Sequence, residues 1–456
     1  MKMKKYGKNL GRIASVGVLS FSILLTNGLA VHAAAATTTK APTVSPWSGK
    51  TLNEGDKYGI FPLGWYTDGT ILNAITPDKF TTLIEATAKK LDQLGFNKKD
   101  ASLTIKPEKE ITRKFVINSL YKLLDNYDLP VTINMKATDA VEFMSKQGIV
   151  KGTNAGLELE KPITEEQAVV MATRMVEFAY DTADAGAKGL FWKVTKGNNT
   201  LYLLGSVHEG STDMYPMTKK VRDAFDASKD LYVEADIING DMSYYLNNIK
   251  YSDGTILKDH VSAETYTKLQ NLLTKMKVPT NAFDQYKPFI INNQLSSLAD
   301  KTSPEEQAIK TNTGVERYFI TKANSMNKPV HELEGLKKQT ELFVNASDAD
   351  QEKDLNEMLD MINSGKGKED DSQQLEQMKK YWIEGNLEAT SKLMNSQSLS
   401  DEPISRDKDM SDKLAALLEQ EGQHTSFVVV GSAHFVVNGM TLDLLKSKGY
   451  DIQFLQ

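Results

Sequence analysis

The chain of 456 residues contains no cysteine. This absence excludes a disulfide framework, a thiolate metal site and a lipoprotein anchor. The sequence also lacks a G-x-S-x-G turn, which together with the missing thiol disfavours covalent catalysis. A fold of this composition must therefore be held together by packing alone.

Basic residues are scarce outside the amino terminus. The formal net charge is −6, but Lys2, Lys4, Lys5, Lys8 and Arg12 all lie in the first dozen residues. Without them, 49 basic residues face 60 acidic ones. Such an acidic protein is a poor partner for nucleic acid or an anionic membrane surface. With 40% hydrophobic and 25% charged residues the composition is globular, and the length favours two domains.

The cationic start precedes an apolar run from Ile13 to Ala30 and small residues around Ala33. This pattern predicts a signal peptide over residues 1–33, followed by a polar linker over 34–50. An uncleaved membrane anchor is the alternative, which Ser, Thr and Asn within the run disfavour. We therefore expect a secreted protein with no stable membrane span after cleavage.

Residues 51–185 contain a weak internal repeat. Three Ile-Thr pairs each open an amphipathic helical pattern, which predicts helices over 75–91, 111–124 and 163–178 with Thr76, Thr112 and Thr164 as N-caps. A further helix is expected over 140–150. The segment is predicted to be a small, mostly helical repeat domain.

The third unit includes Gly148-Ile149-Val150-Lys151-Gly152, and the second unit opens with Thr112-Arg113. In these features the segment resembles the S-layer homology repeat. The resemblance implies that residues 51–185 bind cell-wall polysaccharide and associate the protein with the cell wall. A purely structural helical domain is the other interpretation.

Residues 182–189 are small and flexible, and they predict a boundary before a second domain over 186–456. Strands at 190–195 and 200–204 flank a Gly-Asn turn and predict a hairpin. Strand and helix patterns follow to the end of the chain, with strand candidates at 231–237, 328–334, 427–430 and 450–455. The predicted class is α/β (mixed α+β), with a mixed central sheet flanked by helices.

One pattern occurs twice in this second domain. Leu-Leu-Gly-Ser-Val-His ends at His208, and Val-Val-Gly-Ser-Ala-His ends at His434. In each copy an apolar run reads as a buried strand, Gly-Ser turns the chain and a histidine follows. Because strand ends hold side chains firmly, the pair could grip one metal ion or one substrate. His260 and His331 do not belong to this repeated pattern and are interpreted as surface or structural residues, and His424 is expected to be exposed.

Residues 190–456 resemble the TraB/PrgY/GumN family, which includes the Tiki proteins. The resemblance is carried by a series of short blocks: Leu204-Gly205-Ser206-Val207-His208, Met214-Tyr215-Pro216-Met217, Val233-Glu234-Ala235-Asp236, Tyr286-Lys287-Pro288, Gly314-Val315-Glu316, Lys328-Pro329-Val330, Gly385-Asn386-Leu387, Arg406-Asp407 and Gly431-Ser432-Ala433-His434.

The resemblance implies an active site formed by His208, His434 and Glu234, with Arg406 at a basic position beside them. On spacing alone, Glu234 would be expected to face water. The sequence departs from the family pattern at three positions, where Glu209 replaces an apolar residue, Glu316 a common Asp and Asp407 an Asn. Glu209 could add a metal ligand or a proton acceptor.

Two imidazoles and a carboxylate suit a divalent metal ion that activates water. We therefore expect His208, Glu234 and His434 to bind a metal ion, with Mn, Co and Zn as candidates. Alternatively, Glu234 is the general base. Arg406 would orient a carboxylate or carbonyl, or stabilise an oxyanion.

Tiki proteins are metal-dependent peptidases, so the resemblance implies a secreted hydrolase of peptide or protein substrates. A non-catalytic extracellular peptide-binding or pheromone-binding protein tethered to the cell wall is the alternative. Both interpretations require the three residues to converge, and imidazoles more than about 10 Å apart would exclude a shared metal. With unperturbed imidazole ligands, activity is expected to fall below about pH 6.5.

Overall fold

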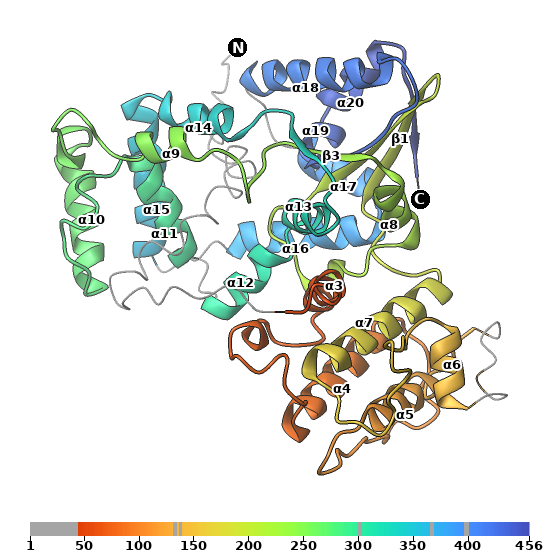
Figure 1. Cartoon of the computed structure of the whole chain (residues 1–456). Helices are drawn as coiled ribbons and strands as arrows, with labels where there is room; N and C mark the ends of the chain where they lie inside the picture. The colour runs from red at the N-terminus through yellow and green to blue at the C-terminus, as the bar shows by residue number, and fades with distance from the viewer. Residues whose placement is uncertain are drawn as a thin grey trace, which may run out of the picture.

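The structure is a computed structural model that describes residues 44–130, 135, 139–299, 303–364, 369–395 and 401–455 (Figure 1). The predicted signal peptide and most of the predicted linker lie outside the described residues. Within these ranges, no helix combines the length and apolar character needed to cross a bilayer.

The amino-terminal part is helical, as predicted, and lies below the rest of the molecule in Figure 1. The Thr side chain before each predicted repeat helix accepts a hydrogen bond from the backbone N–H three residues later, which confirms the three N-caps. The elements are α3 (Gly49–Tyr58), η1 (Leu63–Tyr66), α4 (Pro77–Asp92), α5 (Arg113–Asp125), α6 (Ala140–Lys146) and α7 (Glu165–Thr182).

The three repeated Ile-Thr segments meet one another. Ile75 N donates to Ile163 O at 2.9 Å, and Ile163 N donates to Ile111 O at 3.1 Å. All three isoleucines are buried. The repeat in the sequence therefore corresponds to three helix starts that pair through their backbones and share one apolar centre.

A six-stranded mixed sheet forms the centre of the second part and confirms the predicted fold class. Its order is β4-β3-β5-β2-β1-β6. β4, β3, β5 and β2 are parallel, whereas β1 runs antiparallel to both β2 and β6. The strands are β1 (Leu190–Lys196), β2 (Asn199–Ser206), β3 (Asp230–Val233), β4 (Val330–Glu332), β5 (Thr425–Gly431) and β6 (Asp451–Phe454).

Helices cover the sheet on both faces, so the central strand β5 is an almost continuous apolar run. Phe427 packs its ring against Phe225 and Phe319, at centroid distances of 5.5 and 4.9 Å. These partners belong to α8 (Lys219–Ala227) and α13 (Val315–Ser325). The other covering elements are η3 (Thr212–Met214), α16 (Glu369–Glu384), α17 (Leu387–Asn395), α18 (Asp401–Glu419), α19 (Ala433–Val436) and α20 (Thr441–Ser447).

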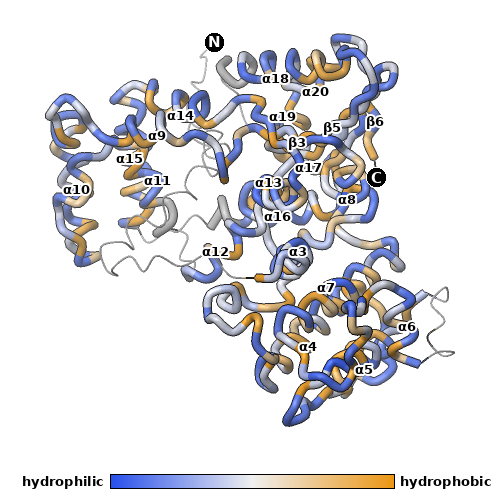
Figure 2. Tube along the Cα trace, viewed as in Figure 1, coloured by the Kyte–Doolittle hydropathy of each residue, from blue (hydrophilic) through white to orange (hydrophobic). Residues whose placement is uncertain are grey.

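A group of helices inserted between β3 and β5 lies to the left of the sheet in Figure 1. It has its own buried cluster, which includes Leu269, Leu295 and Leu355. Orange apolar positions alternate with blue polar ones along these helices in Figure 2, as expected for amphipathic helices. The elements are α9 (Ser243–Asn248), η4 (Leu257–Asp259), α10 (Ala263–Lys275), α11 (Pro288–Ala299), α12 (Pro304–Asn312), α14 (Leu336–Val344) and α15 (Asp348–Asn363).

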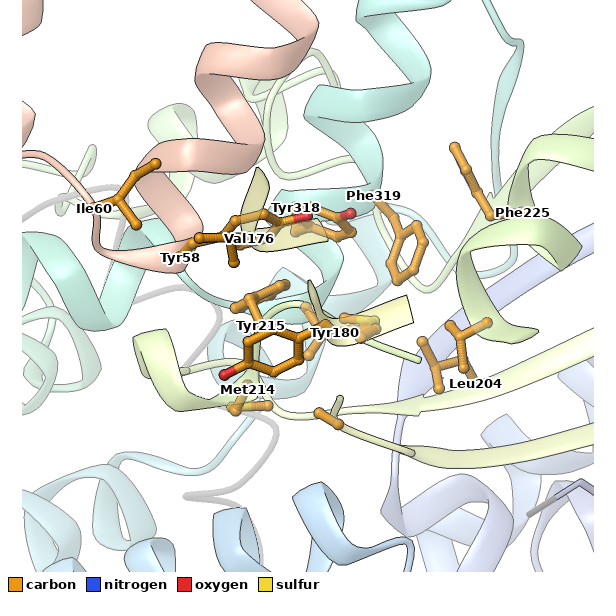
Figure 3. Close-up of a cluster of buried hydrophobic side chains, with 14 of the residues drawn as sticks. Tyr58, Ile60, Val176, Tyr180, Leu204, Met214, Tyr215, Phe225, Tyr318 and Phe319 are labelled. Atoms are coloured by element: carbon orange, nitrogen blue, oxygen red, sulfur yellow. The ribbon is translucent and has the colours of Figure 1, made fainter. Parts of the chain in front are cut away.

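The amino-terminal helices and the sheet part share one apolar cluster (Figure 3). Tyr58 of α3 and Tyr318 of α13 are both buried in it. Glu54 of α3 accepts a hydrogen bond from Tyr318 at 2.7 Å and pairs with Lys322 at 3.1 Å. Helix α3 is therefore fixed to α13 by packing and by a buried ion pair.

Candidate functional site

The predicted site residues follow parallel strands. His208 comes two residues after β2, Glu234 directly after β3, and His434 in α19 after β5. These strands are neighbours, with Ser206 paired to Gly431 and Val233 paired to Val429. Because the carboxyl ends of parallel strands meet at one edge, the topology gathers the three side chains, as in other α/β sheets that bind ligands there.

The backbone of Gly431 marks the point of convergence. A Cβ atom placed on Gly431 would lie 3.5 Å from Glu234 Oε2, 3.6 Å from His208 Nε2 and 3.7 Å from His434 Cδ2. His434 Nε2 is itself 3.5 Å from Glu234 Oε2. Both imidazoles therefore lie within 4 Å of one point, which confirms the predicted convergence and satisfies the 10 Å limit.

Each histidine is held from behind by a carboxylate. His208 Nδ1 lies 2.8 Å from Glu316 Oε1, and His434 Nδ1 lies 2.9 Å from Asp407 Oδ1. Asp407 also accepts from the N–H and the hydroxyl of Thr441, at 2.9 and 2.6 Å. Glu316 and Asp407 are two of the positions where the sequence departs from the family pattern, and here they orient the two rings.

Glu234 is fixed through its other oxygen. Its Oε1 accepts from Gln339 Nε2 at 2.7 Å and from Arg406 Nη2 at 3.0 Å. Arg406 in turn makes a bidentate pair with Glu334, at 2.8 Å from Nε and 2.6 Å from Nη2. The Nε and Nη2 groups of Arg406 are thus used to position carboxylates, which leaves Oε2 of Glu234 directed at the histidines.

Proximity changes the ionisation of these groups. Burial opposes protonation of the imidazoles, but neighbouring carboxylates outweigh it and raise the pKa of His208 to about 9 and of His434 to about 10. Burial likewise opposes ionisation of Glu234, but His434, Arg406 and His208 hold the pKa of its carboxyl well below the usual range. The threshold of pH 6.5 expected from an unperturbed imidazole therefore does not describe the metal-free site.

Carboxylates outnumber fixed cations around this centre. Glu234 and Glu334 pair with Arg406, whereas Glu316 and Asp407 contact the two imidazoles. Even with the guanidinium of Arg317, which lines the adjoining pocket, four carboxyl groups face two fixed cations. With neutral imidazoles the cluster carries excess negative charge. Electrostatics therefore favour an added cation, whether protons on the rings or a metal ion.

A small pocket opens beside the centre. Its enclosed part holds little more than one water molecule. Its lining includes His208 and Glu234 from the centre, and its other side is formed by these residues: Ala235, Ile237, Thr311, Glu316, Arg317 and Gln339.

The donor chemistry fits a divalent metal ion. Each Nδ1 is bound by a carboxylate, the arrangement that orients metal-binding histidines through Nε2. The remaining donors would be His208 Nε2, His434 Nε2 and Glu234 Oε2. Among the residues that the structure describes, no three such side chains form a closed ligand set, so these donors would have to draw together around an ion.

The other candidate residues lie elsewhere. Glu209 is buried but does not line the pocket. His260 stacks on Tyr251 at 4.0 Å, His331 is exposed, and His424 pairs with Asp230 at the opposite ends of the strands. The interpretation of His260 and His331 as surface or structural residues agrees with these positions. His424 was expected to be exposed but is half-buried, because its imidazole pairs with the buried Asp230.

Sequence reasoning missed three residues at the site. Glu334 comes two residues after β4, as His208 comes two residues after β2, so its position at the end of a parallel strand could have indicated it. Gln339 on α14 and Arg317 on α13 carry no such signal, because only the packing of these helices brings them to the pocket.

Comparison with known proteins finds distant relatives of this chain. The chain is 25% identical over 254 residues to "Uncharacterized protein YbaP" of Escherichia coli (strain K12), covering 55% of this chain and 89% of that protein. The protein of the same name from Shigella flexneri matches to the same extent. No solved structure matches the chain.

The family model for the TraB/PrgY/gumN family matches residues 190–453. This range contains the sheet, both Gly-Ser-x-His segments and every side chain of the site. The S-layer homology resemblance of residues 51–185 receives no support from the comparisons and stays a prediction. Over most of its length, the chain belongs to the TraB/PrgY/gumN family.

Proposed function

We propose that the protein is a secreted, metal-dependent hydrolase that cleaves peptide bonds. One observation carries this proposal: two imidazoles and a carboxylate converge, and a hydrogen bond or ion pair on the far side of each fixes its orientation. The groups that provide these contacts are Glu316, Asp407, Arg406 and Gln339. Such support is typical of metal-ligand sets and of catalytic groups that must keep their geometry.

In this proposal His208, His434 and Glu234 hold the metal ion, which when bound supplies a Lewis acid and an activated water at neutral pH. Glu234 acts as a ligand rather than as a general base, because its Oε2 lies 3.5 Å from His434 Nε2, on the side where the two imidazoles converge. Arg406 and Gln339 bind Oε1 of Glu234, while Oε2 faces the histidines and accepts a long hydrogen bond of 3.4 Å from the backbone N–H of Gly431.

The reaction is hydrolysis. The oxygen of water forms a bond to the carbonyl carbon, the C–N bond breaks, and one water proton passes to the departing nitrogen. The products are a carboxylic acid and an amine. The residues of this chain orient the reacting groups and neutralise charge, and no covalent intermediate with the protein is required.

The test uses the purified chain with defined peptides and Mn²⁺, Co²⁺ or Zn²⁺ added singly. We expect metal-dependent cleavage detected by mass spectrometry, and loss of cleavage in Glu234→Gln. His424→Ala, which removes the imidazole of a His–Asp pair outside the site, should retain activity. Peptide that binds with unchanged affinity to all three proteins and is never cut would instead support the binding-protein alternative.

The proposal also places the protein outside the cell. The support is the basic start, apolar run and small residues of the sequence up to Ala33. Protein collected from the medium or cell wall should lack residues 1–33 by intact mass. Recovery of the exported protein with Met1 to Ala30 still attached would contradict this.

A further inference from the structure

Two guanidinium groups near the centre differ in their partners. Arg406 is bound by Glu234 and Glu334, whereas among the described residues no hydrogen bond or ion pair reaches Arg317. The Nε atom of Arg317 is buried and lacks an acceptor. A buried N–H group without a partner costs free energy that a ligand oxygen can recover.

Arg317 is placed to meet a ligand at the candidate site. It follows Glu316 on α13 and lines the same pocket as His208 and Glu234. The neighbouring carboxylate of Glu316 is directed at other partners, because its Oε1 accepts from the Ser206 hydroxyl and contacts His208 Nδ1, and no ion pair joins it to Arg317 among the described residues. Arg317 is thus a cation beside the reactive centre with an open place for an anion.

The pocket also offers an unused acceptor. Gln339 is only 5% exposed, and its Nε2 donates to Glu234 Oε1 at 2.7 Å. Its own Oε1 is buried and has no hydrogen-bond donor among the described residues. One pocket therefore presents an unsatisfied guanidinium donor and an unsatisfied amide acceptor. A ligand complementary to both carries a carboxylate and an N–H group.

We infer that the pocket binds a carboxylate of a peptide substrate on Arg317, while a substrate N–H donates to Gln339 Oε1. This rests on the proposed function and assigns its substrate class. The carboxyl terminus of a peptide supplies both groups within one residue. The enclosed part of the pocket has room for only about one water molecule. It therefore excludes a chain that passes through, and only the polar end of a chain at the pocket mouth can reach both groups. Peptides with a free carboxyl terminus are the preferred substrates.

The test compares three acetylated peptides of equal length: trialanine with a free terminal carboxylate, the same peptide as its terminal amide, and an amidated peptide ending in glutamate. Each is assayed with wild type, Arg317→Gln, Arg317→Lys and the control Arg174→Gln, with metal added. Arg174 is a partly buried arginine on α7 and lies outside the pocket.

Arg317→Gln should lower kcat/KM for the free-carboxylate peptide by roughly 100-fold, mainly through KM, because the half-buried charge partner of the carboxylate is lost. The amide should be a poor substrate already and should lose much less. Arg317→Lys should recover part of the loss, and Arg174→Gln should change neither substrate. If the glutamate peptide rather than the free terminus shows the Arg317 dependence, a side-chain carboxylate occupies the pocket and the carboxyl-terminal assignment is wrong.

Equal losses on the free acid and the amide would overturn the inference and leave the hydrolase proposal intact. If the wild-type protein cuts no peptide, calorimetric titration with the free acid and with the amide still tests whether the pocket binds a terminal carboxylate. Tighter binding of the acid that disappears in Arg317→Gln supports the carboxylate site without catalysis. Equal binding of both peptides to wild type refutes it.

Discussion

The two strand ends that carry the histidines share a sequence pattern but differ in construction. β2 and β5 are adjacent and parallel, yet Gly205 pairs with Val430, whereas Gly431 pairs with Ser206. The two Gly-Ser-x-His segments are therefore offset by one residue. Beyond the offset, β2 continues into a loop that contains His208, while β5 leads into α19 and places His434 in a helical turn.

The carboxylates behind the rings also come from opposite directions along the chain. Glu316 lies in α13, far downstream of His208, and Asp407 lies in α18, upstream of His434. This difference shows that the two Gly-Ser-x-His segments have in common only a histidine at the end of a strand. They do not share one local geometry, so equivalent substitutions in the two segments should have different consequences.

The largest expected effect is the loss of either ring. His208→Ala and His434→Ala should each remove bound metal and lower turnover roughly 1,000-fold or more, because a site with three protein ligands tolerates no missing one. Metal content by elemental analysis and peptide cleavage provide the measurement. Retention of metal and rate in one variant would show that the two histidines do not serve one centre, and His424→Ala is the matched control.

The next test separates the two glycines of the motif. A Cβ at Gly205 would come within 2.9 Å of the Ser432 side chain and 3.1 Å of its Cα, so Gly205→Ala should lower the melting temperature by forcing β2 and α19 apart. A Cβ at Gly431 meets only ordinary contacts with the three site residues. Gly431→Ala should therefore fold normally and lose metal affinity roughly 10- to 100-fold. Calorimetry and metal titration of both variants check this, and similar effects in both would remove the distinction.

The acids behind the rings should show a smaller difference. Glu316→Gln should weaken metal binding roughly 100-fold, and Asp407→Asn about 10-fold. Both substitutions remove a charge and keep an oxygen that can accept from Nδ1. The Asn oxygen would still be held in place by the N–H and the hydroxyl of Thr441, whereas Glu316 Oε1 is held by the Ser206 hydroxyl. Competition with a metal-sensitive dye gives both affinities. A larger loss in Asp407→Asn would reverse the proposed order.

The smallest effect concerns the pH dependence of stability in the metal-free protein. Both histidine pKa values are raised above the unfolded value of about 6.5, to about 9 and about 10. Their contribution is therefore complete below pH 6.5 and is lost as the pH rises through 9 to 10. With chelator present, raising the pH from 6.5 to 10 should lower the melting temperature of the wild type by a few degrees more than that of the double variant His208→Gln/His434→Gln. Parallel curves would show that neighbouring carboxylates do not stabilise the charged rings.

Much of the fold follows from local patterns in the sequence. The N-caps Thr76, Thr112 and Thr164 fixed the starts of three helices to within a residue or two, because a capping side chain acts on its own next turn. The Gly-Asn hairpin and the buried strand β5 were equally visible, since turn residues and apolar runs are local features.

The site could be predicted only in part. His208, Glu234 and His434 lie within three residues of the ends of β2, β3 and β5, so the sequence places them at one edge of the sheet once these strands are parallel. The resemblance was needed to select Glu234, because a lone acid in a short strand usually faces water. Arg317 and Gln339 depend on how α13 and α14 pack against that edge, which no local pattern encodes.

Helix α3 has a consequence for the cooperativity of the whole chain. The family match begins at Leu190, but one connected cluster of buried apolar side chains includes residues on both sides of this boundary, the first being Leu52 and the last Leu445. If α3 unfolded, Glu54 would lose its contacts with Tyr318 and Lys322 of α13, and those two side chains would be left buried without this partner. Helix α13 also carries Glu316. The part of the chain that unfolds cooperatively is thus larger than the family domain. Unfolding of α3 should therefore disturb His208, which Glu316 contacts and which lies more than a hundred residues away in the sequence.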